Sequence, residues 1–238
     1  MAEPPAPLAP EAAAPMDAAG TTLAALAEFL ARGGPAMWAI GALSVTALAI
    51  ALWKAWRLVK GGAWRGSHAR RAVALWHAGD AAGALAEARA GRGYLARLVA
   101  ATIAALVEEG LEGEAAGEEA ERVARGLLAE AASGLRALEL ITMIAPLLGL
   151  LGTVLGMISA FQALEAAGVR ADAATLAGGI WEALLTTAAG MTVAIPVWVA
   201  LTWFESVVDR LRHEMEDLAT RILARPLSHG AALRPAAE

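Results

Sequence analysis

Two long apolar segments limit what this chain can fold into. Residues 140–164 contain no ionisable side chain, and residues 176–204 contain one, Glu182. A helix of about twenty residues rises ~30 Å, which is the thickness of the hydrocarbon core of a bilayer. A third apolar segment at residues 35–53 has no charge either, and only 18% of the chain is charged. The sequence therefore predicts an all-α integral membrane protein with three transmembrane helices.

Lysines and arginines are distributed unevenly around these three segments. One arginine precedes the first segment and one separates the second from the third, whereas twelve basic residues lie between the first and second and five follow the third. Basic residues near the ends of spans stay on the cytoplasmic side. The amino terminus is therefore expected outside and the carboxyl terminus inside. Trp38, Trp53, Trp181 and Trp203 lie near span ends, as interfacial tryptophans do, although packing against neighbouring helices is an alternative.

This topology divides the chain into eight segments, and helices 2 and 3 are expected to extend into the cytoplasm. The segments are a disordered periplasmic tail (1–20), a periplasmic interfacial amphipathic helix (21–34), the first span (35–56), a cytoplasmic helical domain (57–137), the second span (138–164), a short periplasmic loop (165–175), the third span (176–204), and a cytoplasmic C-terminal helix and tail (205–238).

Capping signals and apolar periodicity predict that the cytoplasmic middle of the chain is helical. Ser67 can cap a helix that ends near Gly79, and Asp80 can cap a second helix, so we expect a helical hairpin. Apolar residues at helical spacing predict another helix at residues 94–108. A further helix that starts near residue 114 is compatible with an unbroken path into the second span. An ordinary bundle explains this region better than a repeat array does.

Signatures of catalysis, metal binding and nucleic-acid binding are missing from the sequence. There is no phosphate-binding Gly-x-x-x-x-Gly-Lys loop, no Gly-x-Ser-x-Gly turn and no cysteine, and the net charge is −5. The histidines are dispersed without the spacing of metal ligands. We therefore predict that the chain is not an enzyme and has no catalytic residue. We also predict that it has no cofactor, metal site or nucleic-acid partner. The four histidines are His68, His77, His213 and His229.

Glycines in the second span share one helical face. Gly149, Gly152 and Gly156 recur at positions i, i+3 and i+7, and the last two have the small-xxx-small spacing that lets helix backbones approach closely. Thr153 lies on or beside this face and can present a hydroxyl to a neighbouring helix or a lumen. Packing alone is an alternative explanation of the glycines. Gly190 is a further small residue in the third span. Pro146 is expected to start or kink the second membrane helix, and Pro196 is expected to remove a hydrogen bond inside the third and kink it.

Glu182 is the one carboxylate in the third apolar segment. A charged side chain at the centre of a bilayer costs ~3 kcal/mol, so such a residue usually faces a cavity, a partner or a proton route. The uncharged residues that follow it are long enough to span by themselves, which leaves an interfacial position open. Thr186 lies one turn away near the same face, whereas Thr187 points about 140° away from Glu182.

Three segments resemble the membrane helices of the MotA/TolQ/ExbB proton-channel family. Residues 144–161 (IAPLLGLLGTVLGMISAF) and 178–196 (GGIWEALLTTAAGMTVAIP) look like its two signature helices, and residues 33–44 (GGPAMWAIGALS) resemble the first span of ExbB-type members. Three spans with the amino terminus outside agree with an ExbB-like member. The resemblance places Thr153, Glu182 and Thr187 at the lining of a proton path.

The same resemblance implies partners and a function. It implies a homopentamer in the bacterial inner membrane around the single-span helices of a dimeric ExbD- or TolR-like partner, whose aspartate carries the proton. The resulting motion would reach outer-membrane transporters through a TonB-like protein. The first span would face membrane lipids, and the second and third would line the lumen. A TolQ-like envelope subunit and a non-conducting scaffold remain alternatives, and the sequence leaves H⁺ or Na⁺ open, with H⁺ favoured.

Overall fold

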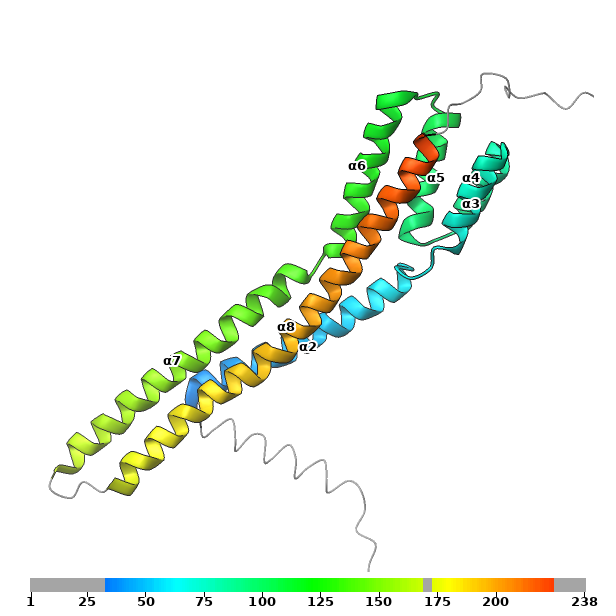
Figure 1. Cartoon of the computed structure of the whole chain (residues 1–238). Helices are drawn as coiled ribbons and strands as arrows, with labels where there is room; N and C mark the ends of the chain where they lie inside the picture. Colours follow the sequence, from blue (N-terminus) through cyan, green and yellow to red (C-terminus); the bar gives the residue numbers. More distant parts are fainter. Residues whose placement is uncertain (1–32, 169–172, 225–238) are drawn as a thin grey trace, which may run out of the picture. The chain divides into compact units, whose positions relative to one another are not determined.

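The computed structural model describes residues 33–168 and 173–224, and Figure 1 shows that they form helices. In chain order the helices are α2 (Gly34–Lys60), α3 (Ser67–Ala78), α4 (Ala81–Ala90), α5 (Tyr94–Val107), α6 (Gly113–Ala132), α7 (Leu135–Ala167) and α8 (Ala173–Leu223). Helices α2, α7 and α8 are long and apolar enough to cross a membrane. No strand occurs in the two described ranges. The prediction of an all-α fold with three membrane helices is confirmed.

Several predicted segments lie outside the described residues. These are the tail at 1–20, all but the last two residues of the amphipathic helix at 21–34, the middle of the loop at 165–175, and the end of the C-terminal segment at 205–238. Within the described part, α8 continues without a break to Leu223.

The chain forms two compact units. The first combines residues 33–45 with residues 143–168 and 173–194, and the second combines residues 46–142 with residues 195–224. Helices α2, α7 and α8 each contribute to both units. The second unit contains a helical core with an extended apolar cluster, and the first contains the glycines and threonines that the sequence singled out.

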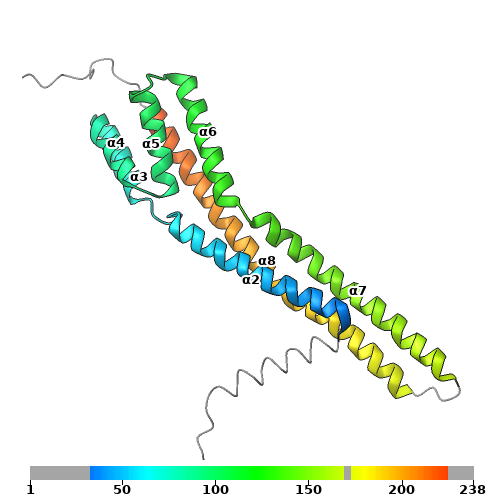
Figure 2. The same cartoon turned by 180° about the vertical axis from the view of Figure 1, so that it is seen from behind.

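Helices α3 and α4 form the predicted hairpin in the second unit (Figure 2). Gly79 ends α3 in the left-handed conformation with φ +95°. The Asp80 carboxylate accepts a hydrogen bond of 2.8 Å from the Gly83 N–H, which confirms its predicted capping role. The prediction for Ser67 is wrong, because Ser67 is already the first helical residue and the capping position belongs to Gly66, which has no side chain.

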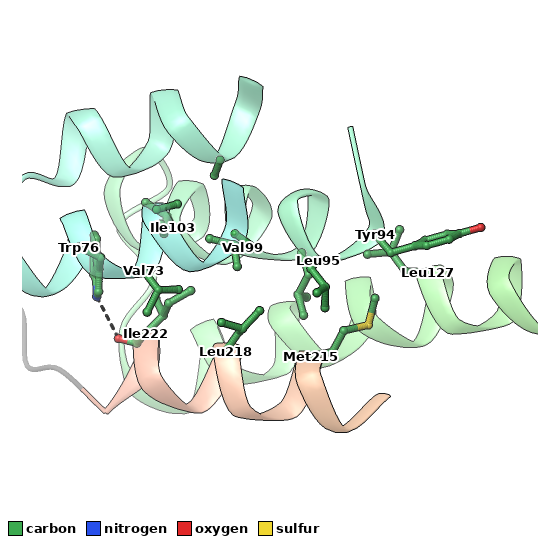
Figure 3. Close-up of a cluster of buried hydrophobic side chains, with 14 of the residues drawn as sticks. Val73, Trp76, Tyr94, Leu95, Val99, Ile103, Leu127, Met215, Leu218 and Ile222 are labelled. Carbon is green, nitrogen blue, oxygen red and sulfur yellow. Dashed lines mark hydrogen bonds between the residues drawn. The ribbon is translucent and has the colours of Figure 1, made fainter. Parts of the chain in front are cut away.

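A cluster of buried apolar side chains joins α3, α4, α5, α6 and α8 in the second unit (Figure 3). Burial of a large apolar side chain stabilises a fold by ~1.5–3 kcal/mol. The Trp76 indole N–H also donates a hydrogen bond of 3.2 Å to the carbonyl oxygen of Ile222. The end of α8 is therefore anchored to α3. The labelled members of the cluster are Val73, Trp76, Tyr94, Leu95, Val99, Ile103, Leu127, Met215, Leu218 and Ile222.

The helical path breaks between α6 and α7 at Ser133 and Gly134. Gly134 has φ +85°, and a Cβ at this position would lie 3.1 Å from the Trp53 ring. The Ser133 hydroxyl turns back and donates to the Glu130 carbonyl oxygen at 2.8 Å. A continuous helix from residue 114 into the second span is therefore wrong, because a left-handed residue that packs against Trp53 separates α6 from α7.

Lys54 of α2 caps this break. Its ammonium group is buried and donates hydrogen bonds to the carbonyl oxygens of Ala131 and Ser133, the latter at 2.7 Å. The last carbonyls of a helix have no partner within the helix, and a lysine can satisfy them. Lys54 therefore links α2 to the end of α6.

Replacing Lys54 by methionine is expected to lower the free energy of unfolding by about 2–3 kcal/mol, because one buried and one partly buried carbonyl lose a charged donor. Thermal unfolding in detergent, followed by circular dichroism, measures this change. Lys60→Met is the matched control, since Lys60 is exposed. Equal melting temperatures for the two variants would contradict the capping role.

Candidate functional site

Helices α7 and α8 run antiparallel and approach closely in the first unit (Figures 1 and 2). A Cβ on Gly149 would lie 2.9 Å from both the carbonyl oxygen of Thr186 and the Cα of Thr187. A Cβ on Gly190 would lie 2.5 Å from the carbonyl oxygen of Ala145. Because these neighbouring atoms belong to the backbone, no rotamer change can make room for a side chain. The close approach requires glycine at both positions.

The same contact continues along both helices. A Cβ on Gly152 would lie 2.5 Å from the Thr186 hydroxyl oxygen, and one on Gly156 would lie 2.8 Å from the Cβ of Ala183. We call this contact the α7–α8 seam, formed by Gly149, Gly152 and Gly156 of α7 with Ala183, Thr186 and Gly190 of α8. Packing explains the positions of these glycines.

Thr186 lies at the centre of the α7–α8 seam and is fully buried. Its hydroxyl is within hydrogen-bonding distance of two carbonyl oxygens, that of Ala183 at 2.7 Å and that of Gly149 on the facing helix at 3.1 Å. A hydroxyl has one proton, so the two acceptors share it. Thr186 is not among the site residues predicted from the sequence. Its position one turn after Glu182, in the span that packs against the glycine face, is the feature of the sequence that could have pointed to it.

The structure gives the two predicted hydroxyls different environments. Thr153 donates a hydrogen bond of 2.6 Å to the Leu150 carbonyl oxygen of its own helix. The Thr187 hydroxyl oxygen is buried and has no hydrogen-bond partner among the described residues. A buried hydroxyl without a partner costs about 1–3 kcal/mol, so such a group calls for an explanation. Among the described residues, Thr187 therefore differs from the other threonines of α7 and α8 in having an unsatisfied buried hydroxyl.

Glu182 is exposed and lines a cavity of about 700 Å³ in the first unit. The other polar side chains of this cavity are Ser159 and Gln162 of α7 and Thr186 of α8, and the start of α2 closes one side through residues 33–36. No basic side chain belongs to the described lining. The cavity is therefore a polar recess in apolar surroundings that places one carboxylate among neutral hydrogen-bonding groups.

Glu182 and Thr187 do not share a face of α8. Five residues correspond to a rotation of about 500°, so the two side chains point about 140° apart, and their levels along the helix differ by about 7.5 Å. In the antiparallel register, Thr153 falls between these two levels, because Gly152 faces Thr186 and Gly156 faces Ala183. The three predicted residues thus lie within one short stretch of the α7–α8 pair but not at one point.

The remaining predicted residues lie inside continuous helices. Pro146 is inside α7 and Pro196 is inside α8. The Thr192 hydroxyl, one turn before Pro196, donates to the Ala188 carbonyl oxygen at 2.8 Å. Across residues 33–168 and 173–224, no group of three His, Asp or Glu side chains is arranged to hold a metal ion.

The fold and the seam define a class of helical membrane proteins in which two glycine-packed spans carry isolated polar groups. Comparison with known families agrees, because the family described as the MotA/TolQ/ExbB proton channel family matches residues 91–217, more than half of the 238-residue chain. The chain belongs to the MotA/TolQ/ExbB proton channel family.

Individual relatives carry the name ExbB. The chain is 41% identical over 87 residues to the biopolymer transport protein exbB1 of Vibrio cholerae, which is 35% of this chain and 38% of that protein. It is 48% identical over 88 residues to the putative biopolymer transport protein ExbB-like 1 of Synechocystis, which is 36% and 34% of the two chains. The matched part spans about a third of each relative.

Proposed function

We propose that this chain is an ExbB-like subunit of a proton channel in the bacterial inner membrane, with its amino terminus in the periplasm. Five copies enclose the single-span helices of a dimeric ExbD-like partner. Proton flow drives motion of the complex, and a TonB-like protein transmits it to outer-membrane transporters. Family membership and the names of the relatives support this proposal. The excess of basic residues between the first two spans supports the orientation.

The observation that carries the proposal is the buried Thr187 hydroxyl, which lacks a partner in the described residues. A lipid-facing or purely structural threonine satisfies its hydroxyl on its own helix, as Thr153, Thr192 and Thr202 do. A hydroxyl left unsatisfied beside the α7–α8 seam can pair with a group of another chain once the side chains that cover it move aside. A carboxylic acid of the partner fits, because it can both donate and accept a hydrogen bond.

In the proposed path, a proton enters from the periplasmic side near Glu182 and reaches a partner carboxylate at the level of Thr187. α8 begins on that side, so Glu182 precedes Thr187 along the direction of flow. The Thr187 hydroxyl stabilises the carboxylate in its charged form by donating, and in its neutral form by accepting. One proton that moves down 100 mV releases about 2.3 kcal/mol, enough to bias a mechanical step.

A non-conducting scaffold is the second candidate, and the Thr153 hydroxyl favours it. This hydroxyl is already satisfied by the Leu150 carbonyl oxygen at 2.6 Å, and the glycine contacts hold α7 and α8 together without any ion path. A TolQ-like subunit would use the same residues with a TolR-like partner, so co-purification of the partner decides between those two systems.

Replacing Thr153 and Thr187 by valine separates conduction from scaffolding, because valine keeps the volume and removes the hydroxyl. We expect the oligomer to remain intact and the proton flux to fall about three- to twentyfold for Thr187→Val, as one membrane hydrogen bond contributes ~0.6–1.7 kcal/mol. A smaller loss is expected for Thr153→Val. Flux is measured with a pH-sensitive dye in liposomes that contain the chain and its partner.

Two further valine variants serve as controls. Thr202→Val removes an exposed hydroxyl that bonds within its own helix, and it should leave both flux and assembly unchanged. Thr186→Val removes the hydroxyl of the seam and should weaken assembly. Full flux in the Thr153→Val, Thr187→Val double variant would reject the conducting role and favour the scaffold.

A further inference from the structure

A small cavity of about 220 Å³ lies beside the carboxyl-terminal end of α2 in the second unit. Its walls come from the α2–α3 connection, the start of α3 and the α4–α5 connection. Four of its lining side chains are basic or can become so: Lys60, Arg65, His68 and Arg92. No carboxylate belongs to the described lining. The composition of the cavity is that of an anion site.

Glycines of the two connections form the floor of this cavity. Gly62 has φ +65°, and a Cβ on it would lie 3.1 Å from the Cα of Gly93. A Cβ on Gly91 would lie 2.8 Å from the Cβ of His68. The Tyr94 N–H donates to the Gly61 carbonyl oxygen at 3.2 Å and ties the two connections together. The cavity is therefore fixed by backbone contacts, and the positive amino-terminal end of α5 adds to its potential.

The two arginines of the cavity lining are available to a ligand. His68 is already paired, because the Glu87 carboxylate accepts from it at 3.0 Å and also pairs with Arg71 at 2.9 Å. In the described part of the chain, neither Arg65 nor Arg92 forms an ion pair within 4.0 Å. Both arginines are exposed at the rim. A guanidinium group suits a phosphate because it can donate two parallel hydrogen bonds.

Exposed tryptophans indicate the depth of the cavity in the membrane. The Lys60 ammonium lies 4.7 Å from the centre of the Trp56 ring, and Trp56 is 61% exposed. Trp64, next to Arg65, is 47% exposed and stacks on Trp203 of α8 with ring centres 6.1 Å apart. Indole rings concentrate at the level of lipid headgroups. We therefore expect the cavity to open at the level of the lipid phosphates.

We propose that this cavity binds the phosphate group of an anionic phospholipid, with Arg65 and Arg92 as the principal ligands. The tryptophans contact the adjoining glycerol and acyl region, and Lys60 adds charge at the rim. The site belongs to the membrane leaflet that meets the carboxyl-terminal end of α2. It is independent of proton conduction, because none of its residues belongs to the α7–α8 pair.

The test compares lipid binding by the whole chain purified in a neutral detergent. Native mass spectrometry measures the dissociation constants for phosphatidylglycerol and phosphatidylcholine. We expect at least about fivefold tighter binding of phosphatidylglycerol, and about twenty-fivefold weaker binding of it by the Arg65→Gln, Arg92→Gln variant, on the basis of about fivefold per basic residue. Both substitutions are on exposed side chains, so the melting temperature should not change.

Matched variants and a soluble anion complete the test. Arg210→Gln, Arg212→Gln removes the same charge from exposed positions of α8 and should weaken phosphatidylglycerol binding less than about threefold. Equal loss in both double variants would overturn the proposal, because it would indicate general charge attraction. Equal affinity for both lipids would overturn it as well. Inorganic phosphate bound with the same dependence on Arg65 and Arg92, without phosphatidylglycerol binding, would assign the cavity to a soluble anion and reject the lipid.

Discussion

Replacing Gly190 by valine is expected to separate α7 from α8 and to prevent assembly of the complex. The Cβ would lie 2.5 Å from the Ala145 carbonyl oxygen and 3.3 Å from the Cα of Gly149, and both are backbone atoms. Overpacking of a tight interface costs about 1–3 kcal/mol, and more where the backbone must move. We expect at least 3 kcal/mol, roughly a hundredfold or more in the folded population. Thermal melting in detergent and light scattering measure stability and oligomer size.

Gly178→Val is the matched control for this experiment. Gly178 lies in the same helix, and a Cβ there meets no atom within 4 Å. The two variants share the cost of a β-branched residue in α8, so any difference between them comes from the contact with α7. Equal melting temperatures would mean that the close approach at Gly190 is unimportant for stability.

The second large effect is expected for Glu182→Gln, which should reduce proton flux about a hundredfold while assembly persists. Glutamine retains the shape and the hydrogen-bonding capacity of the side chain and removes its exchangeable charge. Positioned acid–base groups typically contribute 10²–10⁴-fold to a proton-transfer rate. The cavity already supplies neutral polar groups at Ser159 and Gln162, so folding should tolerate the change.

Two further variants sharpen the interpretation of Glu182. Glu165→Gln makes the same substitution at an exposed position near the end of α7, and it should conduct normally. Glu182→Asp keeps an ionisable group on a shorter side chain, and it should restore part of the flux. Wild-type flux in Glu182→Gln at normal abundance would exclude a proton-carrying role for this carboxylate and leave the Thr187 test unaffected.

The membrane helices could be predicted because few backbone conformations are stable in lipid. A chain in hydrocarbon must satisfy its backbone hydrogen bonds internally, so an uncharged run of sufficient length becomes a helix whatever its neighbours are. The break at Ser133 and Gly134 could not be predicted in this way. A Ser-Gly pair is tolerated inside many helices, and here the break depends on Lys54 and Trp53, which come from another helix.

The sequence was sufficient to name most residues of the candidate site. It was not sufficient to predict which atoms of these residues are in contact. The glycine face of α7 follows from the helical period, and so does the divergence of Glu182 from Thr187. Nothing local indicates that the Thr186 hydroxyl reaches the carbonyl of Gly149, 37 residues away in sequence. The satisfied hydroxyl of Thr153 and the unsatisfied one of Thr187 also depend on packing, because both residues look alike in the sequence.

The α7–α8 seam limits which parts of the proposed complex can change conformation. Contacts between glycines and backbone atoms have no flexible side chains to absorb a shift, and the repulsive wall at these separations is steep. A slide of one helix past the other by a single residue would bring Cβ atoms against the backbone at several levels at once. The two helices are therefore expected to move as one rigid pair. In the proposed motor, we expect the working stroke to occur at the outer surfaces of this pair, where bulky and adaptable side chains meet the partner or the next copy.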